Sequence, residues 1–350
     1  MKKSKFNINT LIRENIKQMK PYASARSEFK DIDANLIYLD ANENPFETGL
    51  NRYPDPQQIP LKEVLARQKD VQVENVLLGN GSDEVLDLII RVFCEPAKDN
   101  VITLPPTFGI YDILANTNNI ENRKVVLNDD FQPNVDEILT TVDKNTKLLF
   151  ICSPNNPTGN TIDTKSIIQL MNSFKGLIVI DEAYIDFASQ ESWISKLENY
   201  PNLIITQTLS KAYGLAGIRL GICYASKEII AVLNKIKLPY NINELTQKRA
   251  LDRVLKPQEV KEEIDSILKE RKWLLKELLQ ASFIKNIYPT DANFILVKVD
   301  NANTRYQQLI KKGIVLRNRT TQPLLENCLR ITVGTKEENE KLIKTLKSIL

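Results

Sequence analysis

The feature that most restricts the fold is a repeated alternation of short apolar runs and helical patterns between residues 76 and 224. The apolar runs have the length of strands, and the stretches between them carry apolar residues at helical spacing. This alternation is typical of an α/β domain whose central sheet is mostly parallel and flanked by helices. The expected strands are residues 76–78, 100–104, 123–127, 147–152, 177–180, 203–206 and 220–224. Ligands of such sheets bind beyond the carboxyl ends of the strands, so a site is expected in the polar loops that follow these runs.

The pattern changes near residue 240 and predicts a second, smaller α+β domain. The expected elements are a long charged helix at 257–280, strands at 294–299, 314–317 and 328–333, and helices at 304–312 and at the C-terminus. A chain of 350 residues exceeds one ordinary domain. The expected units are therefore an N-terminal arm at 1–40, a large domain at 41–239 and a small domain at 240–350.

The arm is polar, with a few apolar residues at helical spacing. These residues are Leu11, Ile12, Ile16 and Met19. They predict a short amphipathic helix that ends before a proline at position 21, and a short strand is expected at 36–39. We expect the arm to pack on the small domain or on a partner subunit.

The composition excludes several classes of protein. The chain has no His, which excludes a Cys/His zinc site and any Ser-His-Asp or Cys-His nucleophile. The four Cys, at positions 94, 152, 223 and 328, lie in apolar runs without a CxxC pair and are interpreted as small core residues in a reducing compartment. A net charge of +3 is too small to indicate a nucleic-acid-binding surface. No apolar run has the length of a membrane span. The basic N-terminus is not followed by the apolar segment of a signal peptide. We therefore expect a cytoplasmic protein with no nucleic-acid or membrane partner and no metal.

The stretch 208–219 carries the strongest chemical signal. It follows an expected strand, is rich in small residues, and holds Lys211 and Arg219 eight positions apart. Small residues let the backbone approach a ligand closely, and a desolvated lysine has a lowered pKa that frees its amine to attack a carbonyl. Arg219 offers a fork of donors suited to a phosphate. A covalently held phosphorylated aldehyde such as pyridoxal 5'-phosphate (PLP) fits this pair, and the alternative is a tight turn with two solvated cations.

Two further polar loops follow expected strands. The loop 79–84 opens a helix, and Ser82 with the backbone N–H groups at the helix N-terminus can hold a phosphate. The alternative is that Ser82 or Asp83 only caps the helix. The loop 153–159 contains Asn156, whose amide can donate to a ring oxygen, although the same residues make an ordinary turn.

A fourth signal lies where the run 177–180 ends in Asp181, with Tyr184 three residues later. A buried Asp needs a cationic partner or strong hydrogen bonds, and a protonated pyridine nitrogen would supply the partner and keep the ring electron-withdrawing. Tyr184 is expected to donate to the ring oxygen. The alternatives for Asp181 are a cap at the strand end and a Mg²⁺ ligand, and no GxxxxGKS/T loop is present to support nucleotide binding.

The set and order of these loops resemble the fold-type I PLP-dependent aminotransferases, the aspartate aminotransferase-like fold. Within that class the chain is similar to the histidinol-phosphate aminotransferase family. The resemblance covers most of the chain and rests on the motifs at 21–26, 42–45, 52–55, 79–84, 105–111, 153–159, 181–184, 210–219 and 329–334. It implies a large PLP-binding domain and a smaller α+β domain.

The resemblance implies a role for each matching position around the cofactor. Lys211 attaches PLP covalently and moves the proton, and it forms the catalytic set with Asp181 and Tyr184. Asp181 pairs with the pyridine nitrogen, while Asn156 and Tyr184 hold the ring oxygen and Phe108 stacks on the ring, where many relatives carry Tyr. The phosphate is held by Ser82, Asp83 through its backbone, Ser210, Arg219 and, from the other subunit of a homodimer, Tyr53.

The substrate side of the site is implied in the same way. Arg330 receives the carboxylate of the amino-acid partner or the phosphate of the phosphorylated one, and Asn156 also contacts substrate. Tyr22 and Arg317 line the phosphate side, and Arg319 competes with Arg317 for that role because both lie on the same side of an expected strand.

The implied reaction has two half-reactions in histidine biosynthesis. Glutamate gives its amine to the cofactor and leaves as 2-oxoglutarate, and the amine then passes reversibly to imidazole-acetol phosphate to give histidinol phosphate. The alternatives with the same cofactor are an aromatic, branched-chain or broad-specificity aminotransferase and a phosphothreonine decarboxylase. A PLP-binding regulator would need a DNA-binding module, for which residues before 40 leave no room, and a scaffold protein without a cofactor is a further alternative.

Overall fold

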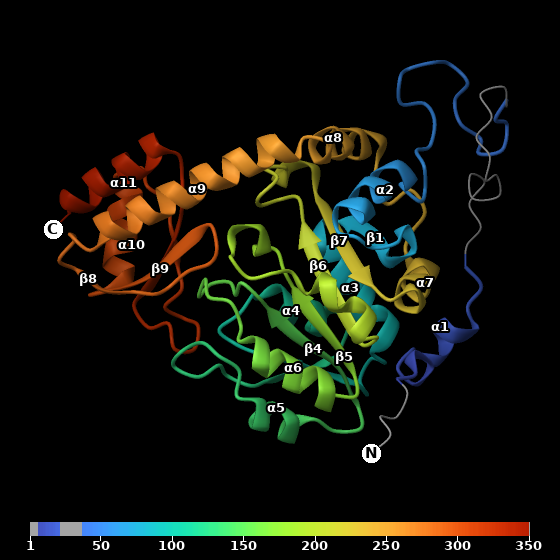
Figure 1. Ribbon diagram of the computed structural model, residues 1–350, viewed down its shortest axis with the longest axis horizontal. Coiled ribbons are helices and arrows are strands. Elements are labelled where there is room, and N and C mark those ends of the chain that lie inside the picture. Colours follow the sequence, from blue (N-terminus) through green and yellow to red (C-terminus); the bar gives the residue numbers. More distant parts are fainter. Residues whose placement is uncertain (1–5, 22–36, 350) are drawn as a thin grey trace.

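The computed structural model describes residues 6–21 and 37–349, which form a larger and a smaller sheet with helices around each (Figure 1). Within these residues the larger sheet has seven strands in the order β1-β7-β6-β5-β4-β2-β3. Their bounds are β1 Val76–Asn80, β2 Asn100–Thr103, β3 Glu121–Lys124, β4 Thr146–Cys152, β5 Leu177–Asp181, β6 Leu203–Thr208 and β7 Leu220–Ala225. Only β7 runs against its neighbours β1 and β6. The predicted α/β fold with a mostly parallel sheet is confirmed.

Helices cover both faces of the larger sheet. One face packs on α1 Glu14–Gln18, α3 Gly81–Phe93, α4 Ile110–Thr117 and α7 Lys227–Ile236. The other face packs on α2 Ile59–Gln68, α5 Val135–Thr141, α6 Thr164–Ser173 and α8 Glu244–Val254. Short 3-10 helices are η1 Ile8–Thr10, η3 Val73–Asn75, η4 Ile185–Phe187, η5 Trp193–Asn199 and η6 Ala216–Ile218. Because both faces are covered, β5, β6 and β7 are buried along their whole length, which explains the apolar runs 177–180, 203–205 and 222–225 within them.

The smaller sheet is antiparallel, in the order β10-β11-β9-β8. Its strands are β8 Ile284–Ile287, β9 Phe294–Val299, β10 Arg317–Asn318 and β11 Cys328–Thr332. One of its faces packs on the long helix α9 Pro257–Leu278, on α10 Ala302–Lys311 and on α11 Lys336–Lys347. Figure 1 shows α9 running from the side of α8 to the smaller sheet.

Several elements differ from the sequence-based expectation. The strand expected at 123–127 is β3, displaced two residues toward the N-terminus, and residues 37–39 are not in a strand. In place of the strand expected at 314–317, the structure has the two-residue β10, which shares only Arg317 with it, and β8 and α8 were not expected. Helix α8 lies after the division expected at residue 239 but packs on α2. The domain division stays a prediction, although this packing joins α8 to the larger sheet.

The described part of the N-terminal arm packs on the larger sheet's helices. Ile12 and Ile16 are buried in the same cluster as the residues of α3 and α7. Arg13 donates to the backbone oxygen of Arg91 across 2.9 Å and pairs with Glu95 across 3.1 Å. These residues do not make the expected contact with the smaller sheet, because their apolar face is already covered by α3 and α7, and a contact with a partner subunit stays a prediction.

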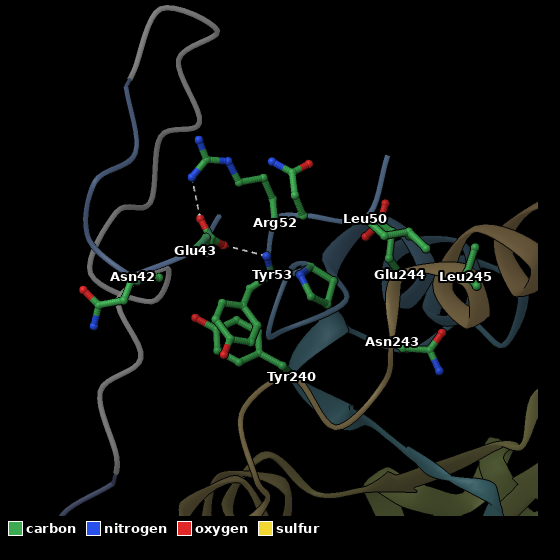
Figure 2. A pocket seen from close by; sticks show the side chains of 12 residues that line it. Asn42, Glu43, Leu50, Arg52, Tyr53, Tyr240, Asn243, Glu244 and Leu245 are labelled. Carbon is green, nitrogen blue, oxygen red and sulfur yellow. Dashed lines mark hydrogen bonds and ion pairs between the residues drawn. The ribbon is translucent and has the colours of Figure 1, made fainter. Parts of the chain in front are cut away.

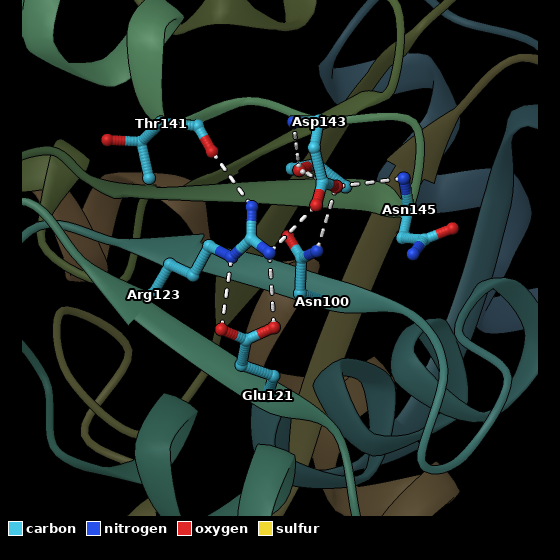
Figure 3. Close-up of polar contacts among 7 residues, drawn as sticks. Asn100, Glu121, Arg123, Thr141, Asp143 and Asn145 are labelled. Carbon is cyan, nitrogen blue, oxygen red and sulfur yellow. Dashed lines mark hydrogen bonds and ion pairs between the residues drawn. The ribbon is translucent and has the colours of Figure 1, made fainter.

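A polar network around Asp143 links the side chains at the β3 edge of the larger sheet (Figure 3). Its carboxylate accepts from Asn100 across 3.0 Å, from the Asn145 backbone across 2.8 Å and from Arg123 across 2.8 Å. Arg123 also pairs with Glu121, across 3.1 Å. The network ties β3 and β2 to the turn before β4.

Three features concern the Cys, the helices and the possible metal ligands of the described residues. All four Cys are buried and free, as predicted for small core residues. Among residues 6–21 and 37–349, no helix has both the length and the apolar character needed to cross a membrane. The same residues contain no group of three or more His, Cys, Asp or Glu side chains arranged to hold a metal ion.

Candidate active site

A cavity of about 250 Å³ lies where the carboxyl ends of the parallel strands meet the smaller sheet. Strands β4, β5 and β6 deliver residues to it from the larger sheet, and β10 and β11 deliver residues from the smaller one. The cavity brings together most of the predicted site residues, namely Ser82, Asp83, Phe108, Asn156, Asp181, Tyr184, Ser210, Lys211, Arg219, Arg317 and Arg330. Cys152, Ala183, Thr208 and Arg319 also line it. Residues up to 248 positions apart in the chain therefore share one cavity, from Ser82 to Arg330.

One end of the cavity is the N-terminus of α3, which directly follows β1. Gly81 has a φ of +74°, and a Cβ there would lie 2.6 Å from Nη2 of Arg219. A Cβ on Gly221 would lie 2.2 Å from the backbone nitrogen of Ser82. Both positions therefore need glycine, since β7 and the Arg219 side chain approach the start of α3 too closely for a larger residue. The N-cap is Asn80, without a side-chain capping bond, so Ser82 and Asp83 lie inside the first turn rather than capping it.

Polar side chains surround this helix N-terminus. Arg219 pairs with the Asp83 carboxylate across 3.3 Å and donates to Ser210 across 3.5 Å. Thr208, at the end of β6, donates its hydroxyl hydrogen to Ser210 across 3.0 Å. Backbone N–H groups at a helix N-terminus, two hydroxyls and a guanidinium form a donor set that suits a phosphate.

Asp181, the last residue of β5, is the buried carboxylate of the cavity, with 2% of its surface exposed. It accepts hydrogen bonds from the Tyr111 hydroxyl across 2.8 Å and from the Ala183 backbone across 3.2 Å. Burial raises the pKa of Asp181, and the hydrogen bond from Tyr111 opposes that rise. Within the described part of the chain, no Lys or Arg lies at ion-pair distance from Asp181. A cationic ring nitrogen in the cavity would supply the partner that a buried carboxylate needs.

Lys211 lies three residues after the end of β6 and lines the same cavity. Its Nζ lies 5.6 Å from the centre of the Tyr184 ring. Burial lowers the pKa of Lys211, the positive charges of Arg330 and Arg219 lower it further, and the Asp181 carboxylate works in the opposite direction. A larger neutral fraction of the amine makes Lys211 a better nucleophile toward an aldehyde. The pKa of Tyr184 is raised, mainly by burial, so its hydroxyl keeps its hydrogen for donation.

The loop between β4 and α6 is held rigidly beside these groups. Asn155 donates to the Pro106 backbone across 2.8 Å and to Thr158 across 2.7 Å. The next residue, Asn156, is buried and accepts a hydrogen bond from Arg330 of β11. This bond joins the larger and the smaller sheet across the cavity.

The smaller sheet presents three arginines to the cavity, namely Arg317, Arg319 and Arg330. Arg317 and Arg330 are direct register partners on β10 and β11. The Nε atoms of Arg319 and Arg330 are buried, and among the described residues neither has a hydrogen-bond partner. Such unsatisfied donors are expected where an anionic ligand binds.

Among the described residues, one predicted site residue does not line this cavity. Tyr53 is 50% exposed and stacks on Tyr240, with ring centres 4.5 Å apart, beside a second pocket of about 500 Å³ (Figure 2). Glu43 fixes this segment by accepting from the Tyr53 backbone across 2.6 Å and from Arg52 across 2.8 Å. Tyr53 was predicted to act across a dimer interface, and this stays a prediction. Tyr22 lies outside the described residues.

Sequence reasoning missed Tyr111, Thr208 and Cys152 as site residues. Tyr111 lies within the motif 105–111 and Thr208 opens the stretch 208–219, so both motifs were noticed without these roles. The bond from Tyr111 to Asp181 joins residues 70 positions apart, and no local spacing indicates it. Phe108 lines the cavity, with its ring edge-on to Tyr111 at 5.7 Å between centres, and its stacking on the cofactor ring stays a prediction.

The residues present fit PLP on the observations above. A glycine-lined helix N-terminus with Arg219 and Ser210 suits the phosphate, the buried Asp181 suits a cationic ring nitrogen, and Lys211 suits a covalent link to the aldehyde. Each group of the cofactor therefore has a chemically matching side chain in one cavity.

Comparisons with known proteins agree with this site. The family model for aminotransferase class I and II matches residues 31–346. The chain is 63% identical to a histidinol-phosphate aminotransferase from Flavobacterium johnsoniae over 98% of both chains. Its fold is similar to that of the histidinol-phosphate aminotransferase from Clostridium acetobutylicum, with a TM-score of 0.79 and 26% identity over 86% of this chain and 91% of the other.

A further likeness is to the histidinol-phosphate aminotransferase from Sinorhizobium meliloti, solved in complex with PLP, with a TM-score of 0.78 over 85% of this chain and 84% of the other. At 24% identity this likeness supports the fold alone. The matches over nearly the full chain, at high identity, give the family. The chain belongs to the class I and II aminotransferases and, within them, to the histidinol-phosphate aminotransferases.

Proposed function

We propose that this chain transfers an amino group between histidinol phosphate and 2-oxoglutarate, with PLP as cofactor and Lys211 as the residue that attaches it. The observation that carries the proposal is one cavity lined by Lys211, the buried carboxylate of Asp181 and four arginines. When bound, the cofactor acts as an electron sink for the carbon that loses or gains a proton. The family to which the chain belongs carries out this reaction in histidine biosynthesis.

The chain's own residues then have distinct tasks. Lys211 moves a proton between the substrate carbon and the cofactor, and its lowered pKa keeps a neutral amine available for this step. Asp181 holds the ring nitrogen in its cationic form, and Tyr111 holds Asp181 as a carboxylate. Asn156 and Tyr184 line the cavity and would orient the ring oxygen of the bound cofactor, and Phe108 would pack on its ring.

Anion binding at the two ends of the cavity positions both ligands. Ser82, Ser210, Arg219 and the Asp83 backbone hold the cofactor phosphate at the start of α3. Arg330 receives the carboxylate of the amino-acid partner, and Arg317 faces the phosphorylated end of the other substrate. Tyr22 is proposed to line that same end.

The assembly and the compartment belong to the proposal as well. A homodimer is supported by Tyr53, which is half exposed, stacks on Tyr240 and lies outside the cavity that it would complete. In the dimer Tyr53 of one subunit contacts the cofactor phosphate of the other. Cytoplasmic location is supported by four free, buried Cys, which suit a reducing compartment.

The test is a titration of the purified, PLP-loaded protein with histidinol phosphate, followed by the absorbance of the bound cofactor. We expect the spectrum to convert to that of the aminated cofactor and to return when 2-oxoglutarate is added. Lys211→Arg should lower the rate by roughly 10²- to 10⁴-fold, the share usual for a general acid–base group. Lys312→Gln, an exposed cation of the smaller unit, should convert at the normal rate.

Three results would contradict the proposal. They are a spectrum that histidinol phosphate leaves unchanged, release of carbon dioxide instead of amine transfer, and normal turnover by Lys211→Arg. Faster transfer from phenylalanine than from histidinol phosphate would favour the aromatic aminotransferase alternative.

A further inference from the structure

Three of the four arginines that line the cavity, Arg317, Arg319 and Arg330, lie on one face of the smaller sheet. Leu316 and Leu329 are buried in the core that this sheet forms with α9, α10 and α11, so they occupy the opposite face. Successive side chains alternate between the faces of a strand, which places Arg317 and Arg330 on the face toward the larger sheet. Arg319 directly follows β10, two positions after Arg317, and donates its backbone N–H to the Cys328 oxygen across 2.9 Å. It therefore shares the face of Arg317 and Arg330.

None of these three side chains is neutralised by the described part of the protein. No Asp or Glu among the described residues lies at ion-pair distance from them. Arg330 donates a hydrogen bond to the neutral side chain of Asn156. Burial, together with the positive charges of Arg330 and Arg317, lowers the pKa of Arg319 to about 10. Three like charges around one cavity are unfavourable unless an anion of matching charge binds between them.

The two substrates of the reaction differ in the charge that they bring. A phosphate monoester carries about −1.5 to −2 charges at pH 7 and three acceptor oxygens, whereas a carboxylate carries one charge. Arg330 is already directed to Asn156, on the cofactor side of the cavity. Arg317 and Arg319, two positions apart on the same face, remain to hold a dianion between them.

We propose that Arg319 is a specificity-determining residue, which acts with Arg317 to bind the phosphate monoester of the phosphorylated substrate as a dianion. This inference rests on the proposed function and adds Arg319 to the residues assigned above. The unsatisfied Nε of Arg319 supplies one donor to a phosphate oxygen, and its Nη atoms supply others. Glutamate, with two single charges, has less need of this second cation.

The test compares Arg319→Gln and Arg319→Lys with the unchanged PLP-loaded enzyme in separate half-reactions. Arg319→Gln should raise KM for histidinol phosphate by about 10- to 100-fold, as expected for the loss of hydrogen bonds to a charged group. KM for glutamate and for unphosphorylated histidinol should change by less than about threefold, which is within the usual effect of an exposed charge. Arg319→Lys keeps the positive charge but loses the paired donors of the guanidinium. Its KM for histidinol phosphate should therefore lie between those of the unchanged enzyme and Arg319→Gln.

Two further readouts separate phosphate recognition from a structural role. Inorganic phosphate, used as a competitive inhibitor of histidinol phosphate, should inhibit Arg319→Gln at least about tenfold less well. KM for histidinol phosphate should rise as the pH falls through the second pKa of the phosphate, about 6, and this rise should be weaker in Arg319→Gln. Lys312→Gln removes an exposed charge from the same unit. It should leave KM for histidinol phosphate, its pH dependence and the inhibition by phosphate unchanged.

The outcomes distinguish this inference from the proposed function. If the unchanged enzyme fails to convert histidinol phosphate, the proposed function fails. If it converts histidinol phosphate but Arg319→Gln alters no KM, or raises KM for glutamate and histidinol phosphate equally, the role of Arg319 is overturned while the proposed function stands.

Discussion

The Tyr111 hydroxyl donates to the Asp181 carboxylate across 2.8 Å, and both side chains are buried against the larger sheet. The Tyr111 ring also stacks on Phe150, with centres 5.0 Å apart, so the ring and the hydroxyl are fixed by different contacts. A buried carboxylate gains from each such donor because the donor favours its charged form. Tyr111 therefore supports the group that would face the ring nitrogen of the cofactor.

Tyr111→Phe should weaken this support without removing the ring. Burial already raises the pKa of Asp181, and the loss of the Tyr111 bond raises it further. The carboxylate then forms only at higher pH, so the acid limb of the kcat profile should move to higher pH and kcat at neutral pH should fall about tenfold. Tyr224→Phe is the control, because the buried Tyr224 hydroxyl has no hydrogen-bond partner among the described residues. Equal pH profiles for Tyr111→Phe and the unchanged enzyme would contradict the prediction.

The charge of Arg330 should be measurable at Lys211. Arg330 is the largest of the charges that lower the pKa of Lys211, and only the neutral amine reacts with an aldehyde. In Arg330→Gln the pKa of Lys211 rises, so the pH midpoint for binding of PLP to the cofactor-free protein should move to higher pH. Arg317→Gln is the matched control, since Arg317 is not among the charges that shift Lys211. A midpoint that moves equally in both variants would show a general effect of charge.

The close approach of β7 to the start of α3 should not tolerate a methyl group. A Cβ at Gly221 would meet Ser82 and Gly81 backbone atoms at 2.2 and 2.3 Å. Gly221→Ala should lower the free energy of unfolding by about 1–3 kcal/mol and displace the phosphate-binding turn, raising the Kd for PLP at least about tenfold. Gly217→Ala adds the same methyl group where nothing lies within 4 Å, and it should change neither quantity. Thermal unfolding and equilibrium titration with PLP measure both effects.

The proposed dimer makes a prediction about the surface near Tyr53. Leu50 and Leu245 are 54% and 62% exposed and line the pocket beside the Tyr53 and Tyr240 stack. An interface that covers them should not accept a charge. Sedimentation should give about twice the 40.0 kDa mass of the chain, and Leu245→Glu should shift the protein toward the monomer and weaken PLP binding. Leu279→Glu, at an exposed leucine on the C-terminal cap of α9, serves as the control.

The fold could be predicted where burial on both faces leaves a continuous apolar run. Strand β5 ends at Asp181, one residue beyond its expected end, because helices cover both faces of the sheet there. Strand β8 was missed because Lys285 and Asn286 are exposed and interrupt its apolar pattern, and β8 is placed by its contacts with β9 and α9. Helix α8 was missed because its sequence is mostly polar and only one narrow side, with Ala250 and Val254, is buried.

The site could be predicted where its groups lie in local motifs, and not where they depend on long-range contacts. Lys211 and Arg219 share one stretch of sequence, and the structure places both at the cavity. The bonds from Tyr111 to Asp181 and from Arg330 to Asn156 join segments that only the folded chain brings together. The sequence presented Arg319 only as an alternative to Arg317. Alternation along a strand predicts that the two side chains lie on the same face, but it does not show whether both contact one ligand.

The edge network around Asp143 should contribute to stability only above the acid range. Hydrogen bonds, first from Asn100 and then from the Asn145 backbone and Arg123, hold the pKa of Asp143 well below its ordinary value of 3.8 (Figure 3). A carboxyl group with a lowered folded-state pKa adds stability above its unfolded pKa, and this stability is lost as the pH falls through the folded one. Asp143→Asn should therefore lower Tm by a small amount at pH 7.

The difference in Tm between Asp143→Asn and the unchanged protein should shrink as the pH is lowered below 3.8, because the unchanged protein loses the same charge. Asp129→Asn, an exposed carboxylate of the same unit, should lower Tm at neither pH. A Tm difference that stays constant from neutral to acid pH would mean that Asp143 acts through the shape of the turn and not through its charge. Added salt should also reduce the difference at pH 7, since the carboxylate and Arg123 lie at the surface, where charges are screened.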